Sequence, residues 1–236
     1  MRDAPRVTGT LINVGAILAG SAAGLTLGSR LPARMQRRVL AGLGLITLVL
    51  GIDNALEWSH TDPLYVLGAV LLGGLAGEAI GIEHRLEQLG RRVQRRFAGD
   101  GDSTIAEGFV TASLLFCVGP LAVLGSIEDG LTGDHTQLAT KAVLDGFAAV
   151  ALTATLGWGV SLSALSVLVY QGVLTLGAGA FEGVLRGESL AALTSAGGLL
   201  IVGIGLKLLE VTDVKVGNFL PALVFAPAIV GLASVL

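Results

Sequence analysis

Long apolar segments separated by short polar stretches recur along the 236-residue chain. Each is bounded by charge clusters, Pro or Gly, and most reach the length of about 20 residues that a helix needs to cross a hydrocarbon layer roughly 30 Å thick. We predict eight spans, over residues 8–28, 39–56, 64–82, 104–126, 138–157, 160–185, 193–210 and 217–235. Only residues 157–161 separate the fifth span from the sixth, so seven spans is the alternative. Together those two segments are too long for one crossing, which favours eight.

The composition places the chain among integral membrane proteins. Hydrophobic residues make up 53% of the sequence and charged residues 14%, and the mean hydropathy is +0.78. These values lie outside the range of soluble domains. The predicted fold class is therefore all-α, a polytopic bundle of transmembrane helices that forms a single integral membrane domain over residues 1–236. Cys117 is the single cysteine, which excludes a disulfide within the chain and a cysteine metal site.

The first apolar run also resembles a signal peptide, because residues 1–20 combine a basic start with an apolar stretch. The run continues through Gly28 without a convincing cleavage site, and this favours a first membrane helix.

Basic residues gather on one side of the predicted topology. The loops after the first and third spans hold most of the Lys and Arg residues of the chain: Arg30, Arg34, Arg37, Arg38, Arg85, Arg91, Arg92, Arg95 and Arg96. The loops on the opposite side, residues 57–62 and 128–137, contain acids and no Lys or Arg. Because short cytoplasmic loops collect basic residues, we expect both termini to lie outside the cytoplasm.

Residues 82–98 predict an amphipathic helix on the cytoplasmic side. Its apolar residues Ile82, Leu86, Leu89, Val93 and Phe97 share one face, opposite the arginines. Such a helix lies among lipid headgroups, so we expect anionic lipids at Arg85, Arg91, Arg92, Arg95 and Arg96. A basic stripe also suits nucleic acid. The flanking spans argue against that use, and no nucleic-acid partner is expected.

Glycines recur at four-residue spacing in three triplets: Gly20, Gly24 and Gly28; Gly73, Gly77 and Gly81; Gly179, Gly183 and Gly187. Small residues on one face allow close helix packing in a membrane, either within one subunit or between copies in a homo-oligomer.

A weak internal repeat accompanies the glycines. "GLITLVLGI" (44–52) resembles "GLLIVGIGL" (198–206) at an offset of 154 residues. A true repeat would relate repeat A (8–82) to repeat B (160–235), with connecting spans over 104–157, and spans 1–3 and 6–8 would have inverted topology, as in many transporters. Chance similarity between glycine-rich apolar segments is the alternative.

Polar side chains within the spans are the candidate functional residues, because a charge at the membrane centre costs about 2.5–3.5 kcal/mol on insertion scales. Lys141 and Asp145 stand one helical turn apart at the outer end of the fifth span. They can neutralise one another without a transport role, or Asp145 can form an ion or proton site. The other candidates for a substrate or ion path are Glu107, Glu78, Gln171, Asn218 and Asn13, with Asp53 and Asn54 as further polar positions. For Glu78 and Glu107, the alternative is a helix-end residue that reaches headgroups or water.

No combination of residues indicates an enzyme. His60, His84 and His135 fall in loops or on the amphipathic helix, and the sequence has no HExxH, P-loop or GxSxG motif. "GDGDS" (99–103) lacks the further ligands of a calcium loop. We expect no enzymatic activity and no cofactor.

The segment "EGFVTASLLFCVGPLAVLGSIEDGLTGDHTQLATKAVLDG" (107–146), with "YQGVLTLGAG" (170–179) and "GNFLPALVFAP" (217–227), resembles the bacterial membrane family known as domain of unknown function 554. Pro120 stands where a small residue would be expected. The resemblance implies a bacterial inner-membrane protein with several spans and brings no established activity.

These features predict a transporter or channel for a small solute or ion, in which intramembrane carboxylates bind a cation or exchange a proton. The alternative is a non-transporting membrane scaffold or partner subunit whose glycine faces pack against another protein.

Overall fold

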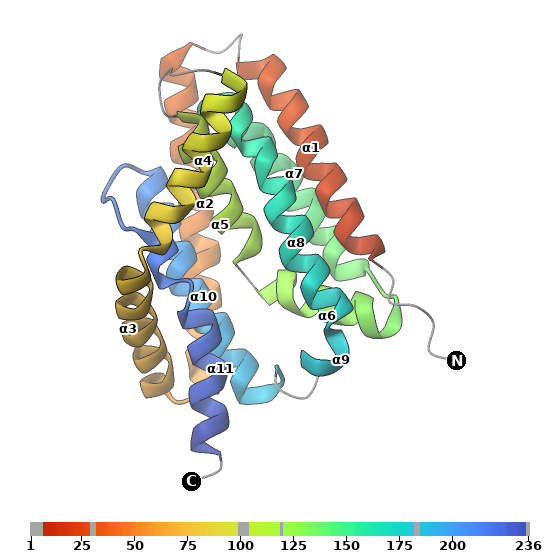
Figure 1. Ribbon diagram of the computed structural model, residues 1–236, viewed down its shortest axis with the longest axis vertical. Helices are drawn as coiled ribbons and strands as arrows, with labels where there is room; N and C mark the ends of the chain where they lie inside the picture. The colour runs from red at the N-terminus through yellow and green to blue at the C-terminus, as the bar shows by residue number, and fades with distance from the viewer. Residues whose placement is uncertain (1–6, 29–31, 99–103, 119, 182–184, 235–236) are drawn as a thin grey trace. The chain divides into compact units, whose positions relative to one another are not determined.

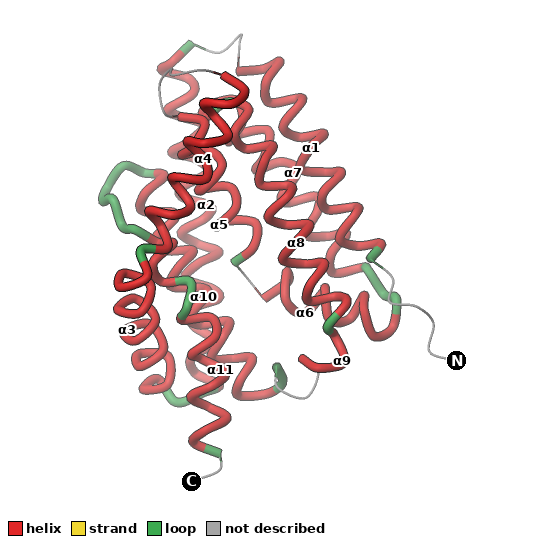
Figure 2. Tube along the Cα trace, viewed as in Figure 1, coloured by secondary structure: helices red, strands yellow, loops and turns green. Residues whose placement is uncertain are grey.

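The computed structural model describes residues 7–28, 32–98, 104–118, 120–181 and 185–234, and these are helical almost throughout (Figure 1, Figure 2). The elements are α1 (Thr8–Gly28), α2 (Ala33–Ala55), η1 (Leu56–His60), α3 (Pro63–Ile80), α4 (Ile82–Ala98), α5 (Thr104–Cys117), α6 (Pro120–Thr132), α7 (Thr136–Leu156), η2 (Trp158–Leu162), α8 (Ser163–Leu176), α9 (Ala178–Phe181), α10 (Gly187–Leu208), η3 (Val216–Phe219) and α11 (Ala222–Ala233). The described residues contain no strand, which confirms the all-helical prediction.

Seven helices in the described part of the chain are long and apolar enough to cross a membrane, or eight if the bent pair α5 and α6 counts as one span. The fifth and sixth predicted spans are separate helices, since α7 ends at Leu156 and α8 begins at Ser163. Gly157 makes the break with a φ of 82°, a conformation that favours glycine.

The spans predicted over 39–56 and 193–210 begin six residues later than the helices α2 and α10. Two other predicted spans are interrupted or shortened in the structure. The span expected over 104–126 consists of two helices bent by 60°, and the second begins at Pro120. Proline has no backbone N–H to continue a helical ladder, which explains the break. The span expected over 160–185 ends earlier, because α8 stops at Leu176.

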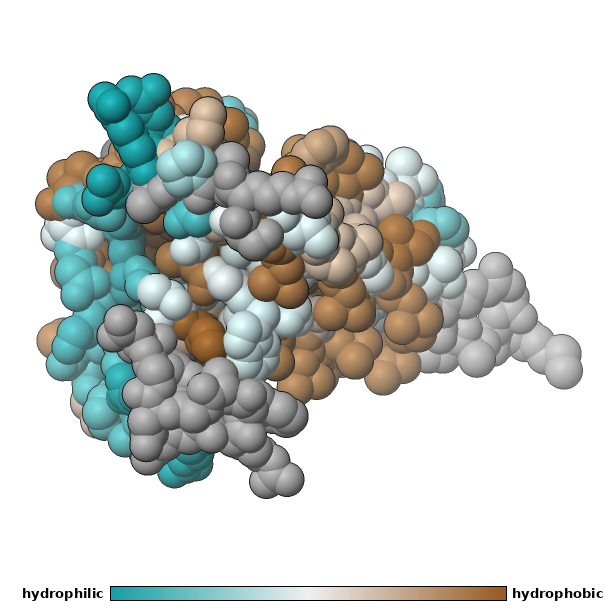
Figure 3. Space-filling model, turned by 90° about the horizontal axis from the view of Figure 1, so that it is seen from above, coloured by the Kyte–Doolittle hydropathy of each residue, from teal (hydrophilic) through white to brown (hydrophobic). Residues whose placement is uncertain are grey.

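Large apolar side chains face outward from the spanning helices. Phe147 is 74% exposed and Leu75 is 71% exposed. Figure 3 shows hydrophobic side chains lying open on the surface that it presents. A surface of this kind suits lipid tails, because exposed apolar area has no cost in the hydrocarbon layer.

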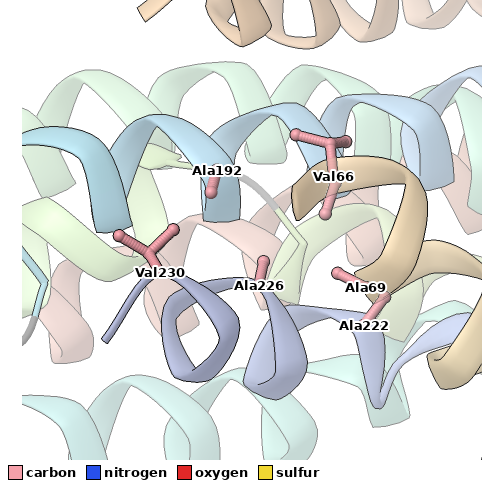
Figure 4. Packing of buried hydrophobic residues seen from close by; sticks show 7 residues of the cluster. Val66, Ala69, Ala192, Ala222, Ala226 and Val230 are labelled. Atoms are coloured by element: carbon pink, nitrogen blue, oxygen red, sulfur yellow. The ribbon is translucent and has the colours of Figure 1, made fainter. Parts of the chain in front are cut away.

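Small residues dominate where helices meet. The buried cluster in Figure 4 joins α3, α10 and α11 and consists of Val66, Ala69, Ala192, Ala196, Ala222, Ala226 and Val230. Lipid provides no hydrophobic force that drives helices together, so the packing depends on close contact between backbones.

The chain forms two compact units. Unit 1 comprises Met1–Gly42, Glu87–Cys117 and Leu121–Phe181, and unit 2 comprises Leu43–Leu86, Val118–Pro120 and Glu182–Leu236. Unit 1 therefore contains α1 with α5 to α9, and unit 2 contains most of α2 with α3, α10 and α11. Each unit combines helices from both predicted repeats.

In unit 1, α1 and α7 lie side by side and run parallel (Figure 1). A Cβ atom placed on Gly20 would lie 2.3 Å from the Gly146 carbonyl oxygen, and one on Gly28 would lie 2.7 Å from the Ala154 carbonyl oxygen. The residue numbers increase together along the contact, as they do only in parallel helices. The first glycine triplet therefore forms this seam.

In unit 2, α2 and α10 run antiparallel, as do α3 and α11. A Cβ atom on Gly73 would lie 2.5 Å from the Ala222 nitrogen, and one on Gly77 would lie 1.8 Å from the Asn218 carbonyl oxygen. Gly73 and Gly77 of the second triplet thus line this contact, whereas a Cβ atom on Gly81 would meet nothing within 4 Å. The third triplet does not line it, because an added Cβ at Gly179 or Gly187 meets nothing within 4 Å; Gly183 lies outside the described residues.

The α2–α10 contact is nearly symmetric. A Cβ on Gly44 would meet Leu209, and a Cβ on Gly198 would meet Ala55. Gly198 and Leu209 each follow their counterparts, Gly44 and Ala55, by 154 residues, so exchanging the two helices reproduces the contact. The next contacts along the helices are exchanged in the same way: Gly51 with Val202, and Leu48 with Gly205. An inverted repeat requires this arrangement, although the repeat itself stays a prediction.

Candidate functional site

A buried polar cluster lies in the α1–α7 seam of unit 1. Asn13 Nδ2 donates a hydrogen bond of 3.0 Å to Asp145 Oδ2, and Lys141 Nζ donates to the same oxygen. Asp145 is only 7% exposed, Lys141 5% and Asn13 0%. The spacing of four residues on α7 places the two charges on one face, and the glycines of the seam bring Asn13 within reach of them. The sequence prediction of an interacting pair is confirmed.

Further polar atoms are buried in unit 1 without a hydrogen-bond partner. Those found among the described residues are Thr10 Oγ1, Asn13 Oδ1, Ser21 Oγ, Asp129 Oδ1, Thr153 Oγ1, Thr175 Oγ1, and both Gln171 amide atoms. Each such atom costs about 1–3 kcal/mol when it remains unsatisfied. Oxygen atoms predominate in this set, so the interior of unit 1 suits water or a solute that accepts oxygen ligands.

An interrupted helix contributes to unit 1, since α5 ends at Cys117. The thiol of Cys117, the last residue of α5, is close enough to Lys141 and Asp145 to interact electrostatically with both. Interrupted membrane helices commonly surround the ion and substrate sites of transporters. The end of α5 at Cys117 therefore adds to the case for a site at this cluster.

A second polar network lies in unit 2 around Glu83, which is 2% exposed. Glu83 Oε2 accepts a hydrogen bond of 2.6 Å from Gly217 N, and Oε1 lies 3.4 Å from Lys207 Nζ. Asn218 Oδ1 accepts from Glu83 N at 2.8 Å, and its Nδ2 donates to Glu78 Oε2. Both Glu83 oxygens have partners, so this network fastens the start of α4 to η3.

The structure divides the predicted path residues between the two units. Asn13, Lys141 and Asp145 form one cluster, and Gln171 is buried on α8 of the same unit. Asn218 and Glu78 belong to unit 2.

Glu107 lies exposed in the first turn of α5, and Asp53 is exposed on α2. The structure places neither carboxylate in a buried cluster. Asn54 is partly buried, at the contact of α2 with Gly198.

Three charged residues of these clusters were missed by sequence reasoning. Asp129 was assigned to an outer loop over 128–137, but α6 continues to Thr132 and buries this carboxylate against Gly9 N at 2.9 Å. Glu83 was assigned to the surface of the amphipathic helix, and Lys207 to the end of a span. An acid at the end of an apolar run was the only available signal for Asp129.

The predicted lipid-binding helix α4 is a helix in the structure. Arg85 and Arg92 are exposed, while Arg91 forms an ion pair of 3.2 Å with Glu87. The side chains of Arg95 and Arg96 lie outside the described residues. Lipid binding by these arginines stays a prediction.

The described residues contain no group of three or more His, Cys, Asp or Glu side chains that could hold a metal ion. The chemistry of the two clusters is that of carboxylate, ammonium, amide and hydroxyl groups.

The helices, their outward apolar side chains and the buried charges define a polytopic helical membrane protein. Residues 8–231 match the family described as "Protein of unknown function (DUF554)", and the chain belongs to that family. The expected resemblance is thereby confirmed.

Two relatives match over almost their whole lengths. The "Uncharacterized membrane protein YdfK" of Bacillus subtilis (strain 168) is 33% identical over 225 residues, which cover 94% of this chain and 95% of the relative. The "Uncharacterized protein YqgA" of Escherichia coli (strain K12) is 31% identical over 224 residues, or 93% and 94% of the two chains. No solved structure matches the chain.

Proposed function

We propose that this protein carries a small solute or ion across the membrane, and that Asp145, Lys141 and Asn13 form part of the path. The observation that carries the proposal is the burial of both charges between apolar helices of unit 1. A buried ion pair is weak support for stability, because desolvation offsets much of the attraction. A binding or proton-exchange role explains why the pair is kept there.

The other unpartnered polar atoms of unit 1 support transport over simple neutralisation. A pair that only cancelled its own charge would need no further polar groups around it. Unit 1 instead buries the Gln171 amide and the Thr175 hydroxyl on α8 without partners. A passing solute or water would satisfy these groups.

The parallel course of α1 and α7 supports the proposed topology of eight crossings. Each crossing reverses the direction of the chain, so two parallel spanning helices must have an odd number of crossings between them in the sequence. The chain between them contains α2, α3 and the bent α5–α6 pair, so the count is odd only if the pair crosses as one broken span. With the arginine loops in the cytoplasm, both termini lie outside, and the inner membrane is the proposed location.

An inverted repeat is part of the proposal. The exchange symmetry of the α2–α10 contact supports it, as does the antiparallel course of α3 and α11. In transporters of this plan the substrate path follows the interface between the repeats. Packing through glycine faces also supports a homo-oligomer, and anionic lipids are the proposed partners of α4.

Flux measurements on purified protein in liposomes test the proposal. We expect uptake of Na⁺, K⁺ or protons in vesicles that contain the wild type, and a fall of about ten-fold in Asp145→Asn, the change that 1.4 kcal/mol of lost binding produces. Glu87→Gln is the matched control, because it removes a carboxylate from an exposed ion pair. Glu107→Gln, measured alongside, tests the exposed carboxylate that was predicted from the sequence.

The double variant Lys141→Gln/Asp145→Asn separates transport from neutralisation. If the pair only cancels charge, removing both partners restores stability and flux together. The proposal expects stability to recover while flux stays low. Full flux in the double variant, in protein that folds as well as the wild type, would refute the proposed role.

A further inference from the structure

Asp129 differs from Asp145 in having no basic hydrogen-bond partner among the described residues. Its side chain is fully buried, and Oδ2 accepts a hydrogen bond of 2.9 Å from Gly9 N at the start of α1. The other oxygen, Oδ1, has no hydrogen-bond partner. The nearby titratable groups that act on this carboxylate are His135 and Asp134. Asp145, by contrast, forms an ion pair with Lys141.

Three helices of unit 1 come together at Asp129. Gly9 begins the contact from α1, and a Cβ atom on Gly130 of α6 would lie 2.2 Å from the Thr175 carbonyl oxygen of α8. Figure 1 shows the start of α1, the end of α6 and the end of α8 at the same end of this unit. In the proposed topology this end faces outward.

Unpartnered oxygen atoms stand within about one helical turn of these contacts. On α1 they are the Thr10 hydroxyl, next to Gly9, and the Asn13 amide oxygen, one turn further along. On α8 they are the Thr175 hydroxyl and the Gln171 amide oxygen, one turn before it. Each of these two pairs shares one face of its own helix, about one turn or 5.4 Å apart along the axis.

The geometry points to a binding site for a monovalent metal cation at the outer end of unit 1. We propose that Asp129 Oδ1 provides the negative charge and that neutral oxygens of Thr10, Thr175, Asn13 and Gln171 complete the coordination. A single carboxylate with no basic hydrogen-bond partner among the described residues can balance one positive charge. Calcium sites use several carboxylates, and the described residues offer no such group.

This proposal deepens the proposed function by naming the ion, and it rests on that function only for the passage of the cation onward to Asp145. Binding itself can be measured without transport. The two ideas can therefore fail separately.

Thermal unfolding of the purified protein in detergent tests the site. We compare Tm in NaCl, KCl and choline chloride at equal ionic strength, since a ligand that binds only the folded state raises Tm. A rise of about 3 °C or more is expected when Na⁺ or K⁺ reaches ten times its Kd. Asp129→Asn should lose this rise, yet it keeps an oxygen to accept from Gly9 N.

Three companion variants identify the ligand group. Glu128→Gln, which removes the neighbouring carboxylate on α6, should keep the cation-dependent rise, and Asp145→Asn shows whether the Lys141 cluster contributes to it. Thr175→Val, which removes a neutral ligand, should weaken the apparent Kd by several-fold and provides a milder change if Asp129→Asn does not fold.

Several outcomes would overturn the proposal. Equal Tm in all three salts, or an unchanged rise in Asp129→Asn or Thr175→Val, excludes the site. A rise that is lost in Asp145→Asn but kept in Asp129→Asn moves the cation to the Lys141 cluster. A Tm that depends on pH through Asp129 but not on the cation identifies a proton site. Each of these results leaves the flux test of the proposed function intact.

Discussion

Unit 1 and unit 2 both bury charged side chains, but they complete the hydrogen bonding of these groups differently. In unit 2, both Glu83 oxygens have partners, Gly217 N and Lys207 Nζ, and the Asn218 amide bridges Glu83 to Glu78. In unit 1, Asp145 has two partners, but Asp129 Oδ1 and the whole Gln171 amide have none.

A complete network fixes two segments together, whereas an incomplete one is costly until something enters it. In the part of unit 2 that the structure describes, Ser195 Oγ is the side-chain atom buried without a partner. The comparison indicates that unit 2 holds its helices through a finished network. Unit 1 is the unit suited to exchange a ligand.

The largest effect should come from the glycine seams, which the two units share. Gly20→Leu would drive a side chain into the Gly146 carbonyl of unit 1, and Gly198→Leu would drive one into Ala55 of unit 2. Overpacking of a closely packed contact costs about 1–3 kcal/mol or more, and backbone contact leaves no room for relaxation. We expect Tm in detergent to fall by more than about 5 °C in both variants.

Exposed glycines supply the controls for this prediction. An added Cβ at Gly15 of α1, or at Gly231 of α11, meets nothing within 4 Å. Gly15→Leu and Gly231→Leu should therefore unfold within about 2 °C of the wild type. If only one of the two variants unfolds at a lower Tm, then the helices inside unit 1 and the helices inside unit 2 do not depend on the same kind of glycine contact.

The next effect should distinguish the finished network from an exposed ion pair on the same helix. Glu83→Gln removes the charge opposite Lys207, and one Gln amide oxygen cannot keep both partners. We expect a cost of about 1–3 kcal/mol, the penalty for an unsatisfied buried group. Glu87→Gln, one turn later on α4, removes an exposed pair with Arg91; such pairs contribute about 0–1 kcal/mol.

Unfolding and flux together make this test specific. Glu83→Gln should lower Tm, while its flux per folded protein stays near that of the wild type. Asp145→Asn should show the opposite result: flux per folded protein should fall strongly, while Tm falls to a lesser extent. A loss of flux in Glu83→Gln at unchanged Tm would contradict the distinction between the two units.

Apolar segment length predicted the helices well, because the membrane imposes nearly the same requirement on each span. The boundaries were wrong where local chemistry interrupts a span. Pro120 divides the fourth predicted span, and α8 ends at Leu176, well before residue 185. The length of an apolar run does not register such breaks.

The site was predictable only where it is local. Lys141 and Asp145 are four residues apart, so helical geometry alone places them on one face. The contact of Asp145 with Asn13 depends on the register of α1 against α7, two helices far apart in the sequence. Glu83 was missed for the same reason, because its partners Lys207 and Gly217 are distant in the chain.

The smallest effect concerns Asp134, in the loop that precedes α7. Its Oδ1 accepts hydrogen bonds from Thr136 Oγ1 at 2.6 Å and from Thr136 N at 2.9 Å. The hydroxyl bond and then the backbone bond lower the pKa of the Asp134 carboxyl below its ordinary value. A lowered pKa in the folded state means that the stabilisation is present above the unfolded pKa and is lost as pH falls through the folded pKa.

We therefore expect Asp134→Asn to unfold at a slightly lower Tm than the wild type near pH 7. The difference should shrink towards zero as the pH falls from about 4 through the folded pKa of Asp134, because protonation of the wild-type carboxyl makes the two side chains alike. Tm measured across this range checks the prediction, with Asp53→Asn, an exposed carboxylate on α2, as the control. A Tm difference that persists at the lowest pH would show that Asp134 acts through its shape and not through its charge.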